Sequence, residues 1–207
     1  MIRFDKLPFF CIPALALLNS APAQAFKLDT HLWIGQQVIN DLELDRRITV
    51  SLSGRPITLP VPDEVASAVL AHRNEYLLGN IGPDAIPDVV VGQTLVHPGR
   101  EEGWKTNDWL EYLLAQSRGN PLGLAFAHGY LGHAAADVFA HTYVNQYAGD
   151  IFALDDGETL VEQRHIALES FISRFTPPFT NASGRDLGPA WSLVQPSDAF
   201  ASFVRDT

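Results

Sequence analysis

The most constraining feature of the sequence is a set of two histidines and an aspartate at four-residue spacing, His133-Ala-Ala-Ala-Asp137 followed by His141. The set lies in a stretch that opens at Asn120-Pro121, a helix cap followed by a favourable first-turn proline, and continues to about residue 143. Each four-residue step advances a side chain by about 40° around an α-helix, so the three side chains line one face. Small alanines between them leave that face open. The chain is therefore predicted to fold around a long helix that presents metal-ligand side chains to its neighbours.

A second pair repeats this spacing in His165-Ile-Ala-Leu-Glu169, inside a predicted helix from about residue 158 to residue 175. Two helices that each offer histidine and carboxylate at positions i and i+4 can hold metal ions in a bundle core. The mixture of imidazole and carboxylate favours Zn²⁺ or another borderline divalent cation. The alternative is a pair of solvated polar faces with incidental histidines. The apolar residues around both pairs favour the metal site.

Charge and cysteine content narrow the class of protein. The chain of 207 residues has 14 Lys+Arg against 24 Asp+Glu, a formal net charge of -10. Such an acidic chain is a poor general binder of nucleic acid or of anionic membranes. One cysteine excludes a disulfide framework and a thiolate-rich zinc site. The length predicts one domain, at most two.

Residues 1–25 have the pattern of a secretory signal peptide, with a basic start, an apolar run over residues 7–18 and an Ala-x-Ala site ending at Ala25. The alternative is a transmembrane anchor, but the run falls short of the roughly 20 apolar residues that a spanning helix needs. We expect cleavage before Phe26 and a mature domain over residues 26–207 without a transmembrane segment. The expected location is secreted or periplasmic.

The rest of the chain reads as mostly α-helical. Residues 47–61 predict a small β-hairpin turning at Ser53-Gly54, and residues 80–102, rich in glycine and proline, predict a long ordered loop. The further predicted helices are one capped by Thr30, one capped by Asp63 and stopped by Gly79, a short one from Thr106 and a last one from Ser197. We expect a mostly α, multi-helix, bundle-like domain with a small β-hairpin insertion.

Four stretches, taken in order, resemble the zinc-dependent phospholipase C family, which shares its fold with zinc-dependent single-strand nucleases. They are Thr30-His31-Leu32-Trp33-Ile34, Gly82-Pro83-Asp84, the set of His133, Asp137 and His141, and the pair of His165 and Glu169. Together they cover most of the expected mature domain. The interval from Asp137 to His141 is shorter than in the bacterial phospholipase C pattern, although members related to glycosylphosphatidylinositol-specific phospholipase D use the shorter one. A proline before the second histidine is also missing.

The resemblance implies a site for up to three zinc ions. The first ion would be bound by His133, Asp137, Asp84 and His97, and the second by His141, His165 and Glu169. The third would be bound by Asp137, His31 and the α-amine and carbonyl of Phe26 at the mature N-terminus. Asp84 would act as a ligand or as the catalytic general base, with Asp88 as the nearby alternative.

The resemblance further implies a zinc-dependent phosphodiester hydrolase, a secreted phospholipase C that takes part in lipid degradation. Its substrate would be a glycerophospholipid at a membrane or micelle surface, and the acidic charge of the chain favours a zwitterionic lipid of the phosphatidylcholine type. A hydroxide activated by the metals would release diacylglycerol and a phosphorylated head group. Two alternatives stay open: a single-strand nuclease of the same fold, and a non-catalytic zinc-binding module. We expect a monomer.

Overall fold

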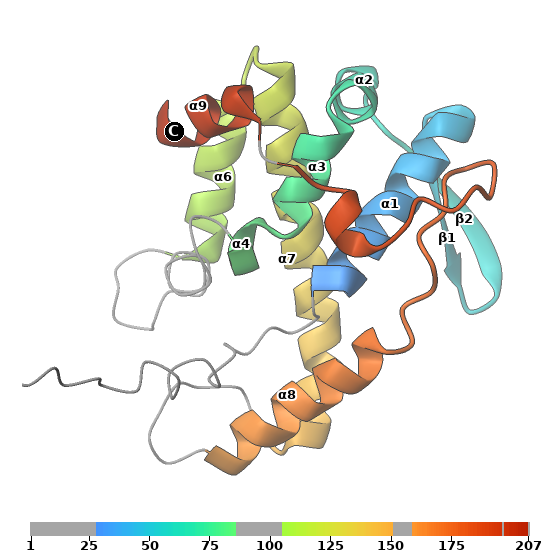
Figure 1. Cartoon of the computed structure of the whole chain (residues 1–207), viewed down its shortest axis with the longest axis vertical. Coiled ribbons are helices and arrows are strands. Elements are labelled where there is room, and N and C mark those ends of the chain that lie inside the picture. Colours follow the sequence, from blue (N-terminus) through green and yellow to red (C-terminus); the bar gives the residue numbers. More distant parts are fainter. Residues whose placement is uncertain (1–27, 86–104, 151–158, 196, 207) are drawn as a thin grey trace, which may run out of the picture.

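Helix α7, Pro121–Ala148, is the longest described element, and the other helices are arranged along it (Figure 1). It starts where the sequence predicts, because the side chain of Asn120 accepts a hydrogen bond from the backbone N–H of Gly123 at 3.2 Å. It ends later than predicted, at Gly149, whose positive φ of 108° gives a left-handed C-cap. The extra residues extend α7 by more than one turn beyond His141.

The computed structural model describes residues 28–85, 105–150, 159–195 and 197–206. The predicted signal peptide and most of the predicted long loop lie outside the described residues. The elements other than α7 are α1 Leu28–Asp45, β1 Arg47–Leu52, β2 Arg55–Pro60, α2 Asp63–Ala71, α3 Arg73–Asn80, α4 Gly82–Ala85, α6 Thr106–Gln116, α8 Thr159–Ser173, a 3₁₀ turn Ala190–Ser192 and α9 Asp198–Asp206. The prediction of a mostly α domain with one small hairpin is confirmed. Within the described residues, no helix is long and apolar enough to cross a membrane.

The hairpin forms where predicted. Strands β1 and β2 are antiparallel, with Leu52 opposite Arg55. Ser53 and Gly54 both have positive φ, 51° and 77°, as a two-residue type I′ turn requires. The hairpin lies at the edge of the molecule, largely exposed, and extends from the end of α1 (Figure 1).

The helices predicted from Thr30 and from Asp63 have different boundaries in the structure. Thr30 does not cap α1, which begins two residues earlier; its hydroxyl instead bonds the hydroxyl of Thr176 at 2.9 Å. The helix predicted from Asp63 is two helices, separated at His72, whose φ and ψ of -126° and 53° are not helical. Asp63 is the first helical residue rather than the cap, and Gly79 lies inside α3 rather than after it.

The place of Gly79 inside α3 is explained by the crossing of α3 and α7. A Cβ built on Gly79 would lie 2.2 Å from the carbonyl oxygen of Phe126, and one on Gly129 would lie 2.0 Å from that of Tyr76. The two helix backbones therefore touch, which only paired glycines permit. This close crossing brings the end of α3, and α4 after it, over the middle of α7.

We expect Gly129→Ala to lower the free energy of unfolding by about 1–3 kcal/mol or more, because its methyl group would overlap a backbone atom that cannot move aside. The measurement is the urea unfolding midpoint. Gly132→Ala is the matched control one turn along α7, where the nearest atoms to the added Cβ belong to the side chains of Asn80 and Tyr76, the closest at 3.2 Å. Equal midpoints for the two variants would contradict the role given to the crossing.

The hydrophobic core is built by α1, α2, α3, α6, α9 and the first half of α7. Its large buried side chains include Leu32, Ile39, Leu42, Val69, Leu77, Leu113, Phe126 and Phe200. Helix α8 lies apart from this core and crosses the second half of α7 (Figure 1). Among the described residues of α8, the fully buried side chains are His165 and Glu169. A polar pair therefore occupies the position on α8 that apolar side chains fill elsewhere.

Candidate metal centre

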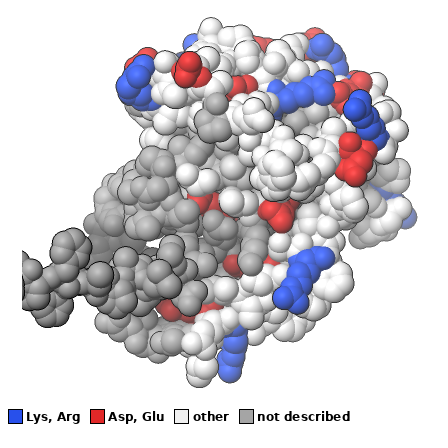
Figure 2. Space-filling model, viewed as in Figure 1, with Lys and Arg blue, Asp and Glu red and all other residues white. Residues whose placement is uncertain are grey.

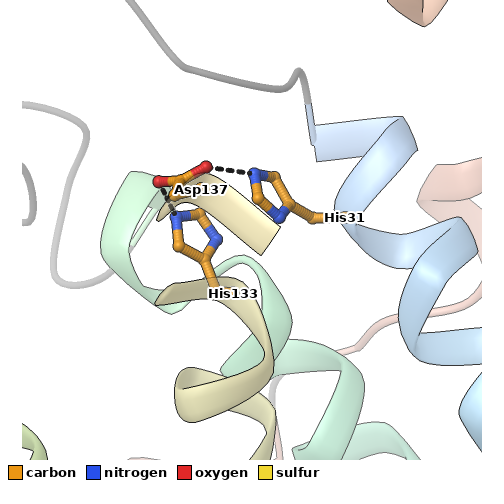
Figure 3. Close-up of side chains that lie close together, drawn as sticks. All are labelled: His31, His133 and Asp137. Carbon is orange, nitrogen blue, oxygen red and sulfur yellow. Dashed lines mark ion pairs between the residues drawn. The ribbon is translucent and has the colours of Figure 1, made fainter. Parts of the chain in front are cut away.

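The first group of candidate ligands joins α1 to α7. His31 from α1 and His133 and Asp137 from α7 place one donor atom each within 4.8 Å of the others. Their relative exposures are 1%, 0% and 6%. Oδ1 of Asp137 lies 3.3 Å from Nε2 of His31, and Oδ2 lies 3.0 Å from Nε2 of His133. Figure 3 shows the carboxylate facing both rings, so its two oxygens serve different histidines.

The second group joins α7 to α8. His141, His165 and Glu169 also bring one donor atom each within 4.8 Å of one another. Nε2 of His165 lies against the carboxylate of Glu169, and the rings of His141 and His165 meet edge to face with centroids 5.2 Å apart. His141 follows Asp137 by one helical turn, so the two groups lie next to each other along α7.

Asp84 is held beside the first group by the short helix α4. It is 1% exposed, and its Oδ1 lies 3.9 Å from Nε2 of His133. Its backbone N–H donates to the carbonyl of Ile81 at 3.1 Å, which closes the turn after α3. The structure thus brings together seven of the nine predicted ligands. Phe26 and His97, and the alternative base Asp88, lie outside the described residues.

Electrostatics favour a bound cation at the first group. Burial, with a smaller contribution from the charge of the neighbouring His133, lowers the pKa of His31 to about 4, so this ring is neutral at pH 7 and able to ligate a metal. Burial alone would raise the pKa of Asp137, but the hydrogen bonds and charges of His133 and His31 outweigh it and hold the pKa below its usual value. The site therefore combines a neutral imidazole with a buried anion.

His133, the second histidine of this group, shows the opposite pKa shift to His31, because the Asp137 carboxylate lies beside it. Burial by itself lowers the pKa of His133, but the hydrogen bond and charge of Asp137 outweigh burial and raise it. A carboxylate that raises the proton affinity of Nε2 also raises the affinity of this position for a divalent cation. In the second group, burial lowers the pKa of both His141 and His165.

Asn80, the last residue of α3, is a positioning residue that the sequence did not reveal. Its backbone carbonyl accepts the Nδ1–H of His133 at 2.8 Å, which turns Nε2 toward Asp137. Such a partner for the second ring nitrogen is typical of histidines that bind metals. Its buried side chain donates to the carbonyl of Tyr76 at 2.9 Å. No sequence pattern could have identified Asn80, because the contact to His133 uses a backbone atom that every residue has.

The Asn80 side chain also sits where α1 approaches. A Cβ on Gly35, one turn after His31, would lie 2.9 Å from the Asn80 amide. We expect Asn80→Ala to weaken zinc binding by about 10–100-fold, because the lost amide loosens the carbonyl that orients His133. Competition with a chromogenic chelator measures this. Asn40→Ala is the matched control, since its buried amide donates to the carbonyl of Thr180 away from the site; equal zinc affinities for both variants would contradict the prediction.

The donor set fits a divalent metal by its chemistry. Four imidazoles and three carboxylates come from α1, α4, α7 and α8, all buried or half-buried. Their nitrogen and oxygen atoms suit Zn²⁺. The division into three metal sites stays a prediction.

Comparison with known proteins supports the same chemistry. The family model for zinc-dependent phospholipase C matches residues 30–178, which include both groups and Asp84. No curated protein and no solved structure matches the chain significantly.

Proposed function

The chain belongs to the zinc-dependent phospholipase C family, and we propose that it is a hydrolase that cleaves the phosphodiester of glycerophospholipids. One observation carries the proposal: two buried groups of imidazole and carboxylate donors meet on consecutive turns of α7. Zinc ions bound there would supply Lewis-acid stabilisation of a phosphoryl group and water of lowered pKa. The seven side chains described above would hold them.

The chain's own residues would divide the work as follows. Asp137 presents one oxygen to His31 and the other to His133, an arrangement suited to a carboxylate shared between two ions. His141, His165 and Glu169 would hold a neighbouring ion between α7 and α8. Burial of both groups limits access of bulk water and strengthens their electrostatic effect on a phosphate.

Asp84 is proposed to orient or deprotonate the attacking water. Its carboxylate is buried, and its Oδ1 lies 3.9 Å from Nε2 of His133. The alternative role of Asp84 is that of a metal ligand. A variant without the charge would lose activity in either role, but it would lose zinc only if Asp84 is a ligand.

Asp84→Asn keeps the shape of the side chain and removes its charge. If Asp84 is a base or orienting group, kcat of the variant should fall by about 10²–10⁴-fold with zinc content retained, because general-base catalysis contributes on that scale. If Asp84 is a ligand, the variant should lose zinc as well. Metal analysis beside steady-state kinetics separates the two roles. Unchanged kcat would remove Asp84 from the site and make Asp88 the candidate.

The proposed substrate is a zwitterionic lipid of the phosphatidylcholine type, cleaved to diacylglycerol and a phosphorylated head group. The family supports a phospholipid, and the net charge of -10 favours a neutral lipid over an anionic one. The test compares phosphatidylcholine with single-stranded DNA, each with and without a chelator. We expect chelator-sensitive release of phosphocholine and far slower cleavage of DNA. Faster DNA cleavage would favour the nuclease, and zinc binding without either activity would favour a non-catalytic module.

We further propose that the protein is exported and that cleavage after Ala25 leaves the α-amine of Phe26 as a ligand. The signal-like pattern of residues 1–25 supports this. N-terminal sequencing of the protein from the periplasm or culture medium tests it, and a chain that retains residues 1–25 there would contradict it.

A further inference from the structure

Helix α8 and the two residues that follow it expose apolar side chains away from the metal centre. Leu160, Phe171 and Phe175 are 65%, 60% and 69% exposed. The rings of Phe171 and Phe175 lie with centroids 4.8 Å apart and so form one continuous apolar surface. His165 and Glu169 point the opposite way, into the protein. The outer side of α8 therefore exposes large side chains that would gain from burial.

The charges on this side of α8 are all positive. Between Leu160 and Phe175 the exposed positions are Leu160, Gln163, Arg164, Ala167, Phe171, Arg174 and Phe175. In the described part of the chain neither arginine pairs with a carboxylate. Figure 2 shows basic groups among uncharged surface where α8 crosses the front of the molecule. A basic and aromatic face on a chain of net charge -10 is typical of a helix that lies on a lipid surface.

We propose that the outer face of α8 together with the two residues that follow the helix, a surface formed by Leu160, Arg164, Phe171, Arg174 and Phe175, docks the protein on a phospholipid bilayer. The aromatic rings enter the boundary between head groups and acyl chains, and the arginines bind lipid phosphates. The proposal rests on the proposed function only in that the bilayer also holds the substrate. A symmetric contact with a second copy fits poorly, because it would bring like charges together.

Docking through this face keeps the metal centre close to the lipid. His165 and Glu169 lie on the inner side of the same helix, so the thickness of one helix, about 10 Å, separates them from the docked surface.

The outer face of α7 provides a matched comparison. Tyr143 and Tyr147 are 53% and 59% exposed, with ring centroids 4.6 Å apart. Because α7 and α8 pack with their histidine faces together, this pair faces the opposite direction. From residue 135 to residue 147 the exposed positions of α7 carry no charge. Val138 and Phe139 on the same stretch of α7 are 75% and 80% exposed, so this face is at least as apolar as that of α8 and differs from it in lacking arginines.

The experiment measures partition of the zinc-loaded protein onto vesicles. The vesicles contain a phosphonate analogue of phosphatidylcholine, in which carbon replaces the glycerol-side ester oxygen on phosphorus, with and without phosphatidylglycerol. We expect the wild type to bind, and Phe171→Ser with Phe175→Ser to weaken binding by at least about tenfold. Arg174→Gln should weaken it about fivefold when phosphatidylglycerol is present. Tyr143→Ser with Tyr147→Ser should leave it unchanged.

Hydrolysis is measured separately, on a short-chain phosphatidylcholine below its micelle concentration, so that the docking and the proposed activity can fail independently. The Phe171→Ser, Phe175→Ser variant should cleave this monomeric substrate like the wild type. Docking is overturned if the wild type does not bind vesicles, if the phenylalanine and arginine variants bind equally well, or if the tyrosine variant loses as much. It is also overturned if sedimentation shows a dimer that only the phenylalanine variant disrupts.

Discussion

Replacing Asp137 with alanine is expected to lower kcat/KM by about 10³-fold or more and to remove zinc from the protein. One of its carboxylate oxygens faces His31 and the other faces His133. The change therefore removes a candidate metal-ligand oxygen beside each of these two rings. Loss of a single buried electrostatic stabiliser costs on the order of 10²–10³-fold in rate, and here the bound ions are lost as well. Metal analysis and kinetics on the same preparation measure both effects.

The control for this variant is Glu111→Ala, which removes an exposed carboxylate from α6. It should leave zinc content and rate unchanged. Asp137→Asn adds a finer comparison, because it keeps the shape and loses only the charge. Full zinc occupancy in Asp137→Ala would refute the shared role of this carboxylate.

Removal of zinc is expected to release α8 from α7. The fully buried side chains of the described part of α8 are His165 and Glu169, both candidate ligands, so little apolar burial holds this helix in place. Metal binding contributes folding free energy where the ligands come from different elements. A chelator should therefore speed amide hydrogen exchange in α8 by at least about tenfold, whereas α3, packed directly on α7, should keep its protection.

Two histidine variants test the same point without a chelator. His165→Ala in the presence of zinc should reproduce the fast exchange of α8. His128→Ala should not, because this histidine lies on α7 off the ligand face and its Nδ1–H donates to the carbonyl of Leu124 at 2.9 Å. Equal protection of α8 with and without chelator would show that its apolar contacts suffice.

Local signals in the sequence predicted the elements whose ends are set by local hydrogen bonds. Asn120 starts α7 through its own side chain, and the Ser53-Gly54 turn forms because both residues adopt positive φ. The predicted start of α1 was wrong, and the break at His72 was not predicted. In α1 the supposed cap, Thr30, bonds Thr176 from the far end of the chain, which no local pattern reveals.

The candidate site divides in the same way. Four-residue spacing alone placed His133, Asp137 and His141 on one face and paired His165 with Glu169, because helical geometry fixes which residues share a face. The resemblance to a family added His31 and Asp84. Which residues meet across helices was decided by packing: the stacking of His31 on His133, with ring centroids 3.8 Å apart, depends on the place of α1.

The sequence by itself determined the ligand types, their order and the helices that carry them, since these follow from composition and a period of 3.6 residues. Only the tertiary structure decided that Gly79 and Gly129 let α3 touch α7, and that Asn80 thereby reaches His133 with its carbonyl. Such contacts depend on how closely two backbones approach. That distance is set by the packing of side chains remote in sequence, and no local pattern encodes it.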